Sequence, residues 1–214
     1  EKDDGTGIGG IGGVCLNWGC IPSKSLLKNA EVVNHLNHAE DWGIEIGDWS
    51  ASMSKAVDRS RQVSKALTNG IGFLFKKNKI TVVQGKATLE SSTQVAVEGG
   101  DTLTAKNIVI ATGARARSLP GLEIDGENII TSRHALELRE QPEAVAIIGA
   151  SAIGCEFAYY FNSYGVNVMM FEMLPHLVPR EDEEVSFELE RQFGRQGIEF
   201  ALAASVSGVE KKNG

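Results

Sequence analysis

One stretch of the chain alternates apolar runs, glycine-bounded turns and helical spacing in an order that few folds accommodate. An apolar run (AVAII) is followed by a short turn between two glycines, a helical segment, a second apolar run, another helical segment and a third run. Strands that alternate with helices of this length predict a parallel sheet covered by helices. Strands are expected at 144–148, 167–171 and 198–201, and helices at 152–164 and 181–196, the second ended by Gly197.

The turn after the first of these strands has the context of a dinucleotide-binding fingerprint. Gly149 and Gly154 bracket the turn, which follows a strand and opens a helix, although Ser151 occupies the position of the second glycine. Serine is small, so we expect slight weakening of the site. Glu172 ends the next strand, where an acid accepts hydrogen bonds from an adenosine ribose. No arginine follows at 173–175, which favours NAD over NADP, and the alternative for Glu172 is a solvated strand end.

A second feature is a cysteine pair, Cys15 and Cys20, in the run GGVCLNWGCIPSK at 12–24. In one regular helix such a pair would have Cα atoms roughly 8–9 Å apart, by helix rise and radius. A disulfide needs Cα atoms within about 7 Å, so a bond here requires a distorted turn. Pro22, which disfavours helical geometry at Ile21, is expected to supply that distortion. Small-loop disulfides of this strained kind are used for redox chemistry.

Two other interpretations of the cysteines are weaker. A zinc site needs about four ligands, and the remaining candidates, Cys155 and the four histidines, do not complete one with the pair, so no metal is expected. A structural disulfide is disfavoured because three cysteines in 214 residues is a low density for a secreted scaffold. Cys155 is expected to be a small buried hydrophobe. His35 and His38 are expected on a solvated helix face.

The cysteine run resembles the redox-active segment of the flavoprotein disulfide reductases, the class I pyridine nucleotide-disulfide oxidoreductases. The residues at 15–24, CLNWGCIPSK, are most similar to those of the dihydrolipoyl (lipoamide) dehydrogenase branch. The run has one departure from the family pattern, which is Val14 in place of the usual Thr. The resemblance implies an α/β chain with three-layer FAD- and NAD(P)-binding Rossmann-like folds, both incomplete. It divides the chain into a partial FAD-binding domain with the redox-disulfide helix (1–116) and a partial NAD-binding domain (117–214).

The resemblance also assigns residues to roles. Cys15 would be the interchange thiol, Cys20 the thiolate beside the flavin, and Lys24 would form a buried ion pair with Glu156 near the flavin and the nicotinamide. Cofactor contacts are expected from residues at the FAD site (Glu1, Gly12, Gly13, Lys24, Ala87, Thr112, Gly113) and at the NAD site (Gly149, Ser151, Gly154, Glu156, Glu172, Val206).

The activity implied by the resemblance is reoxidation of protein-bound dihydrolipoamide with NAD⁺ through FAD and the cysteine pair. The partner would be a lipoyl domain of a 2-oxo acid dehydrogenase or glycine cleavage complex, and the full-length parent a homodimer. The family also has an N-terminal GxGxxG unit and a C-terminal domain that donates a His–Glu pair, so we expect an internal fragment, inactive alone. Alternatives are another disulfide reductase, such as mercuric reductase, or a non-catalytic truncated nucleotide-binding module.

Composition narrows the class of protein further. A net charge of −7 leaves no basic footprint for nucleic acid, and no apolar run approaches the length of a membrane span. We expect a protein of the cytoplasm, or of an organelle matrix, where a cycling disulfide suits a reducing compartment.

Periodicity predicts the remaining elements. Apolar residues at helical spacing predict helices, the second with a stripe that includes Leu67 and Leu74, and short apolar runs predict strands. The further helices are expected at 21–40, 51–77 and 132–138, and the further strands at 80–83, 93–97, 103–104, 108–111 and near 205–209.

Overall fold

The computed structural model describes residues 11–119 and 121–210 of the chain. Within these residues it has two compact units: one from the residues up to 22 together with 61–115, the other from 23–60 together with the part from 116 onward. The predicted boundary at 116/117 lies beside one of these breaks. The assignment of the two parts to two cofactors stays a prediction.

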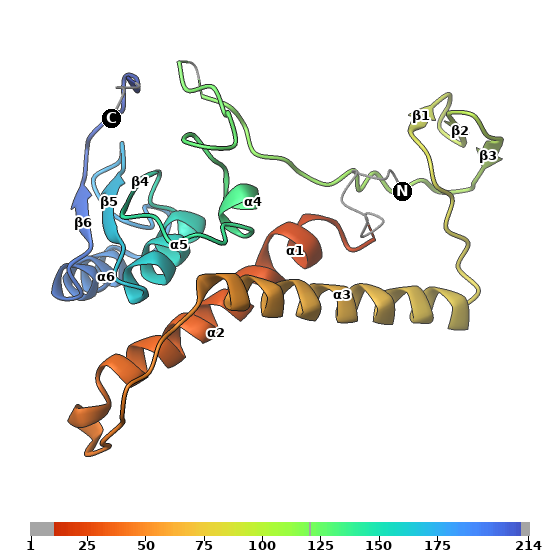
Figure 1. The fold of residues 1–214 in the computed structure, drawn as a ribbon. Helices are drawn as coiled ribbons and strands as arrows, with labels where there is room; N and C mark the ends of the chain where they lie inside the picture. Colours follow the sequence, from red (N-terminus) through yellow and green to blue (C-terminus); the bar gives the residue numbers. More distant parts are fainter. Residues whose placement is uncertain (1–10, 120, 211–214) are drawn as a thin grey trace. The chain divides into compact units, whose positions relative to one another are not determined.

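The second unit contains a parallel sheet, as the alternation of strands and helices predicts. Strands β4 (Ala144–Ile148), β5 (Asn167–Phe171) and β6 (Glu199–Ala201) pair in the order β4-β5-β6, and α5 (Ala152–Ser163) and α6 (Glu183–Arg195) connect them (Figure 1). The five elements begin and end within two residues of their predicted bounds. The α/β fold class is therefore confirmed.

The core of this unit lies where the sheet, α5 and the start of two long helices meet. Large apolar side chains less than 2% exposed come from α2 (Cys20–Asn37), α3 (Met53–Lys77), α5, β5 and the loops around them, and each contributes about 1.5–3 kcal/mol by leaving water. The largest apolar ones are Tyr160, Leu26, Leu136, Met170, Leu177, Ile198 and Val57.

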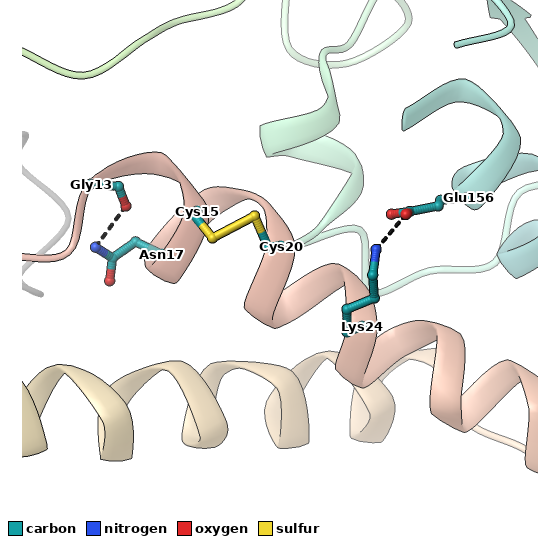
Figure 2. Close-up of a disulfide and its surroundings, with 6 residues drawn as sticks. All are labelled: Gly13, Cys15, Asn17, Cys20, Lys24 and Glu156. Carbon is teal, nitrogen blue, oxygen red and sulfur yellow. Dashed lines mark hydrogen bonds and ion pairs between the residues drawn. A yellow bond between two sulfur atoms is a disulfide. The ribbon is translucent and has the colours of Figure 1, made fainter. Parts of the chain in front are cut away.

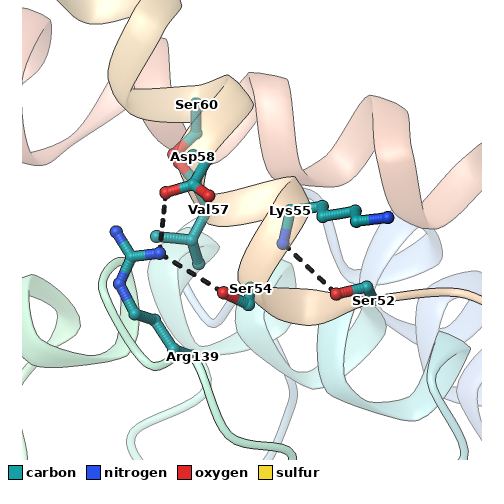
Figure 3. Close-up of polar contacts among 7 residues, drawn as sticks. All are labelled: Ser52, Ser54, Lys55, Val57, Asp58, Ser60 and Arg139. Atoms are coloured by element: carbon teal, nitrogen blue, oxygen red, sulfur yellow. Dashed lines mark hydrogen bonds and ion pairs between the residues drawn. The ribbon is translucent and has the colours of Figure 1, made fainter.

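The two long predicted helices are present. α2 ends at Asn37 and is followed by the short 3₁₀ helix η1 (Ala39–Trp42), with Gly43 in a left-handed conformation at φ 69°. α3 is continuous through Asn69 and Gly70. At its start the Ser52 hydroxyl accepts a hydrogen bond from the Lys55 amide at 3.4 Å, which satisfies one of the unpaired donors of the first turn (Figure 3).

The apolar stripe predicted along α3 is wrong in its second half. Leu67 and Leu74 are 45% and 50% exposed, whereas Ser60, Ser64 and Thr68 are buried. These three hydroxyl residues are four apart, so they share one helix face, rotated away from the predicted stripe. The hydroxyls of two of them form hydrogen bonds that sequence spacing could not reveal, Ser60 to the Val57 carbonyl and Thr68 to Asn17.

The first unit contains an antiparallel sheet of β1 (Ala87–Leu89), β2 (Gln94–Val97) and β3 (Thr102–Thr104). The last two strands were predicted and β1 was not. The predicted strands at 80–83 and 108–111 are wrong, because neither segment pairs with a strand within the described residues. Val109 and Ile110 are 87% and 70% exposed rather than buried on both faces. An apolar run becomes a strand only when a neighbour satisfies its backbone hydrogen bonds.

Two smaller predictions also need correction. The segment near 205–209 has no regular structure, and the helix predicted at 132–138 is shorter, α4 (Ser132–Ala135). Thr131 and His134 form a capping box at its start, in which the histidine ring takes the place of the usual acid. The turn that follows α4 places the side chain of Leu136 in the core of the second unit.

Candidate active site

Cys15 and Cys20 form a disulfide at a break between two helices (Figure 2). α1 (Gly13–Trp18) ends before Gly19, whose backbone is non-helical at φ −147° and ψ −115°, and α2 begins at Cys20. The break brings the two Cα atoms to 4.6 Å, which confirms the predicted distorted turn. Both cysteines are exposed, so the bond is accessible from solvent.

The residue that causes the distortion is different from the one predicted. Ile21 and Pro22 both lie inside α2, in its first turn. Proline is tolerated there because the amide nitrogens of the first turn have no intrahelical acceptor. Gly19 breaks the helix instead, and a Cβ built on it would lie 3.1 Å from the Val14 carbonyl oxygen.

The glycine pair at the start of α1 has a conformational reason. Gly12 and Gly13 have φ values of 98° and 60°, in the left-handed region that favours glycine. A Cβ on Gly12 would overlap the side chain of Leu16. The pair therefore presents bare backbone immediately before the disulfide, as close approach of a bulky ligand requires.

Asn17, between the two cysteines, is 2% exposed and connects α1 to its surroundings. Its amide nitrogen donates to the Ile11 carbonyl oxygen at 3.0 Å and to the Gly13 carbonyl oxygen at 3.1 Å, and Figure 2 shows the second of these bonds. Its amide oxygen accepts from the Thr68 hydroxyl at 3.3 Å, and its backbone carbonyl accepts from Arg61 at 2.7 Å. The two partners on α3, Thr68 and Arg61, lie 51 and 44 residues away along the chain, so local spacing does not predict these bonds.

Lys24 and Glu156 form the predicted ion pair, between α2 and α5 (Figure 2). The prediction that the lysine is buried is wrong, since its side chain is 61% exposed and that of Glu156 is 28% exposed. A shallow pocket lies beside the pair, and it is lined by Glu156 and by apolar and small residues of the two helices (Ser23, Leu26, Leu27, Phe157, Tyr160).

The turn before α5 has the geometry that a nucleotide pyrophosphate requires. Gly149 has a φ of 98°, and its amide donates to the Phe171 carbonyl at 2.8 Å, which fixes the turn to β5. A Cβ on Gly154 would overlap the Gly149 carbonyl, so glycine permits the close packing of helix on turn. Ser151 is exposed at the N-cap of α5, and its hydroxyl makes no capping hydrogen bond. The residues present therefore fit a dinucleotide.

Glu172 is 7% exposed, so the interpretation as a solvated strand end is wrong. One carboxylate oxygen accepts from the Ala150 amide at 2.7 Å, and the other accepts from the Leu174 amide at 2.9 Å. These bonds leave further lone pairs on the carboxylate. Glu172 thus ties the end of β5 to the glycine turn, in addition to the ribose contact predicted for it.

Cys155 is a buried free thiol, as expected. Burial raises its pKa from 9.0 to about 11, and the carboxylates of Glu172 and Glu156 act in the same direction. The thiol donates to the Ala150 carbonyl at 3.4 Å. It therefore stays protonated and unreactive at neutral pH.

The other predicted cofactor residues stay predictions. Ala87 begins β1 and pairs with Val97, and Gly113, beside Thr112, has a φ of 79° in an exposed segment of the first unit. Val206 is half-buried in the irregular segment after β6 of the second unit. Glu1 lies outside the described residues.

No further candidate site of two kinds lies in residues 11–119 and 121–210. They contain no group of three or more potential metal ligands, and none of their helices combines the length and apolarity needed to span a membrane. His35 lies 3.6 Å from Glu31 and contacts the ring of Trp42 edge-on, while the His38 ring donates from Nδ1 to the Asn34 carbonyl at 2.8 Å.

Comparison with known families decides the class of the protein. The model of the pyridine nucleotide-disulphide oxidoreductase family matches residues 3–214. The chain belongs to this family. The family predicted from the cysteine run is therefore confirmed.

Curated relatives in this family are named dihydrolipoyl dehydrogenase. One from Rhizobium etli is 41% identical over 95% of this chain and 46% of its own length, and one from Chlorobaculum parvum is 42% identical over 93% and 43%. The chain thus spans a little under half the length of these relatives.

Solved structures agree with this assignment. LpdA from Mycobacterium tuberculosis has a TM-score of 0.83 at 25% identity, covering 95% of this chain and 46% of the other. The HOCl-induced flavoprotein disulfide reductase RclA from Escherichia coli has a TM-score of 0.76 at 25% identity, covering 96% and 43%.

Proposed function

We propose that this chain is the redox-disulfide and nucleotide-binding part of a dihydrolipoyl dehydrogenase. The observation that carries the proposal is the exposed Cys15–Cys20 disulfide at the helix break, preceded by bare glycine backbone. The names of the curated relatives support the choice of dihydrolipoamide as the dithiol.

The cysteine pair performs thiol–disulfide exchange. A thiolate of dihydrolipoamide attacks the Cys15 sulfur, a mixed disulfide forms, and the Cys15–Cys20 bond breaks to leave a thiolate on Cys20. The second substrate thiol then attacks the substrate sulfur of the mixed disulfide. Oxidised lipoamide leaves, and the two electrons remain on the Cys15–Cys20 dithiol.

When bound, FAD would supply an acceptor for the electron pair of the dithiol, and NAD⁺ would supply the final hydride acceptor. Gly12 and Gly13 would present bare backbone to FAD, Ala87, Thr112 and Gly113 would help to hold it, and the Lys24–Glu156 pair would contribute to both cofactor sites. Gly149, Ser151 and Gly154 would hold the NAD pyrophosphate at the N-terminus of α5, Glu172 would bind the ribose, and Val206 would contact the adenine.

Partners and location follow from the same proposal. The substrate is dihydrolipoamide on a lipoyl domain of a 2-oxo acid dehydrogenase or glycine cleavage complex, and the whole enzyme is a homodimer. The cytoplasm, or an organelle matrix, supplies the reducing surroundings in which the disulfide cycles.

A second candidate is a flavoprotein disulfide reductase with another substrate, as in mercuric reductase. Its support is the likeness to RclA, whose identity to this chain equals that of LpdA. The substrate specificity separates the two candidates, because only the first predicts rapid reduction of the cysteine pair by dihydrolipoamide.

The test is the visible spectrum of the chain with FAD, before and after dihydrolipoamide is added. We expect a new long-wavelength absorption from a thiolate beside the flavin, and its loss in Cys20→Ser. A mass shift after alkylation reports reduction of the pair independently of FAD, with Cys155→Ser as a control that leaves the pair intact. A pair that monothiols reduce as fast as dihydrolipoamide would contradict the proposal.

A further inference from the structure

We propose that Asn17 is a positioning residue that holds Cys15 and Cys20 side by side when their bond is open. The inference rests on the proposed function to this extent, that the pair cycles between disulfide and dithiol. It adds a role for three residues, Asn17, Thr68 and Arg61, to which the sequence analysis assigned none.

The helix that contains Cys15 cannot hold its own shape. α1 has six residues, and helices far shorter than about 12–15 residues are unstable in water. Gly12 and Gly13 at its start have left-handed backbone conformations, and the non-helical Gly19 ends it. When the disulfide opens, the position of Cys15 therefore depends on non-covalent contacts of α1.

Asn17 supplies those contacts at both ends of the helix. Its amide nitrogen bonds Ile11, before the helix, at 3.0 Å and Gly13, in the first turn, at 3.1 Å. Its amide oxygen and its backbone carbonyl accept from Thr68 and Arg61 of α3, at 3.3 Å and 2.7 Å. Both amide hydrogens and the amide oxygen are thus used, at a side chain that is 2% exposed.

The helix α3 can hold this network in place, because it is long and the face that carries Thr68 is buried. It is 25 residues long, and Thr68 is 8% exposed on its buried hydroxyl face. Arg61 also lies over the ring of Trp18, 4.8 Å from its centroid, so it contacts the last residue of α1 as well as Asn17. None of these contacts involves a sulfur atom, so the network persists when the disulfide is reduced.

The network shifts the redox equilibrium in a definite direction. Reduction of a disulfide is favoured when the freed loop gains conformational entropy. A loop held by Asn17 gains little, so the network favours the disulfide and keeps the thiols adjacent for reoxidation. Loss of the network should favour the dithiol.

The experiment is a dithiothreitol titration of the whole chain without flavin or lipoamide. One S–S bond breaks in the protein and one forms in dithiothreitol, with two electrons and two protons passing to the cysteine pair. The mixtures are quenched with acid and alkylated in denaturant, and the dithiol fraction is read by mass, with Cys155 adding one constant label.

Three variants define the role. For Asn17→Ala we expect about a tenfold shift toward the dithiol, which corresponds to about 30 mV. For Thr68→Val, which removes one bond of the network, we expect about threefold. The matched control is Asn78→Ala, because the Asn78 amide also donates to a carbonyl four residues earlier, Leu74 at 2.8 Å, at an exposed site ten residues beyond Thr68. It should shift the equilibrium less than about twofold, within the scatter of such effects.

A folded Asn17→Ala chain with the equilibrium of Asn78→Ala would overturn the proposal. If Asn17→Ala does not unfold cooperatively, Thr68→Val decides, and a value equal to that of Asn78→Ala again overturns it. Because the titration uses neither FAD nor lipoamide, its outcome is separate from that of the proposed function.

Discussion

At the residue scale, Gly149 and Gly154, which bracket the turn before α5, are glycines for different physical reasons. Gly149 needs a φ of 98°, whereas Gly154 lies within a helix and lacks only the room for a Cβ, because the Gly149 carbonyl occupies that space. Close packing of α5 against the turn therefore requires glycine at 154, and substitution by alanine, which adds one methyl group, tests this requirement.

We expect Gly154→Ala to destabilise the chain by about 1–3 kcal/mol, because the added methyl forces α5 away from the turn. The matched control is Gly194→Ala in α6, where a Cβ meets no atom within 4 Å. This variant should be neutral or more stable by about 0.5–1 kcal/mol, since alanine favours the helix. Urea unfolding of both variants measures the difference, and equal losses would contradict the packing argument.

The buried thiol of Cys155 predicts a pH dependence of stability. Its pKa is raised from 9.0 to about 11, so between these values the unfolded chain has lost a proton that the folded chain keeps. The free energy of unfolding should therefore fall as the pH rises through 9–11, by up to about 2–3 kcal/mol from this group. Below pH 9 the thiol is protonated in both the folded and the unfolded chain, so its full contribution to the free energy of unfolding is present.

Cys155→Ala should flatten the fall in stability across pH 9–11, measured by denaturant unfolding without reductant. Burial also raises the pKa of Tyr160 and Tyr164, so the variant retains a decline at higher pH. Tyr159→Phe serves as the comparison, because it removes one hydroxyl from the same helix at a half-buried position and leaves the Cys155 thiol in place. A Cys155→Ala profile identical to that of the wild type in this window would contradict the assignment.

At the scale of elements, the first turns of α3, which belong to the second unit, are held there by an ion pair and by a buried side chain. Arg139 donates to Asp58 at 2.7 Å and to Ser54 at 3.4 Å, and both partners lie on α3 (Figure 3). Arg139 and Asp58 are 50% and 53% exposed, so solvent screens the pair. Val57, next to Asp58, is fully buried in the core cluster.

Burial should outweigh the ion pair in this region. We expect Val57→Ala to lower the free energy of unfolding by about 1–3 kcal/mol, through lost transfer energy and a cavity. Asp58→Asn should cost less than about 1 kcal/mol, and less still in high salt. Thermal unfolding at two salt concentrations checks both, and a larger loss for Asp58→Asn would mean that the ion pair dominates.

At the scale of the whole molecule, the exposed apolar segment around Val109 and Ile110 is the most consequential feature. The side chains of Val109 and Ile110 are 87% and 70% exposed, and no strand pairs with this segment among residues 11–119 and 121–210. Uncovered apolar segments with free backbone groups are templates for association.

We expect the chain on its own to self-associate with increasing concentration, and Val109→Lys to reduce this. Light scattering coupled to size-exclusion chromatography measures the mass. Thr104→Lys, at an exposed position of the paired strand β3, adds the same charge elsewhere and should have less effect. A monomer at all concentrations, or equal effects of the two lysines, would contradict this reasoning.

The sequence predicts well wherever local spacing is enough. The elements from β4 to β6, both long helices and the disulfide agree with expectation, because apolar periodicity, glycine positions and a recognisable cysteine run indicate them. The Lys24–Glu156 pair joins residues 132 apart, and only the family resemblance predicted it. The sequence failed for the strands at 80–83 and 108–111, for the buried face of α3 and for the exposure of Lys24. Each failure concerns what lies beside a segment, and one segment's periodicity does not contain that information.

The sequence by itself therefore determined the family, the Cys15–Cys20 pair and the glycine turn, because these depend on residues close together along the chain. Only the tertiary structure placed the break at Gly19, buried Glu172 against the turn, and joined Asn17 to Thr68 across 51 residues. Hydrogen bonds over such separations form only after the intervening chain has folded. Whether a side chain is exposed or anchored is decided by its neighbours in space.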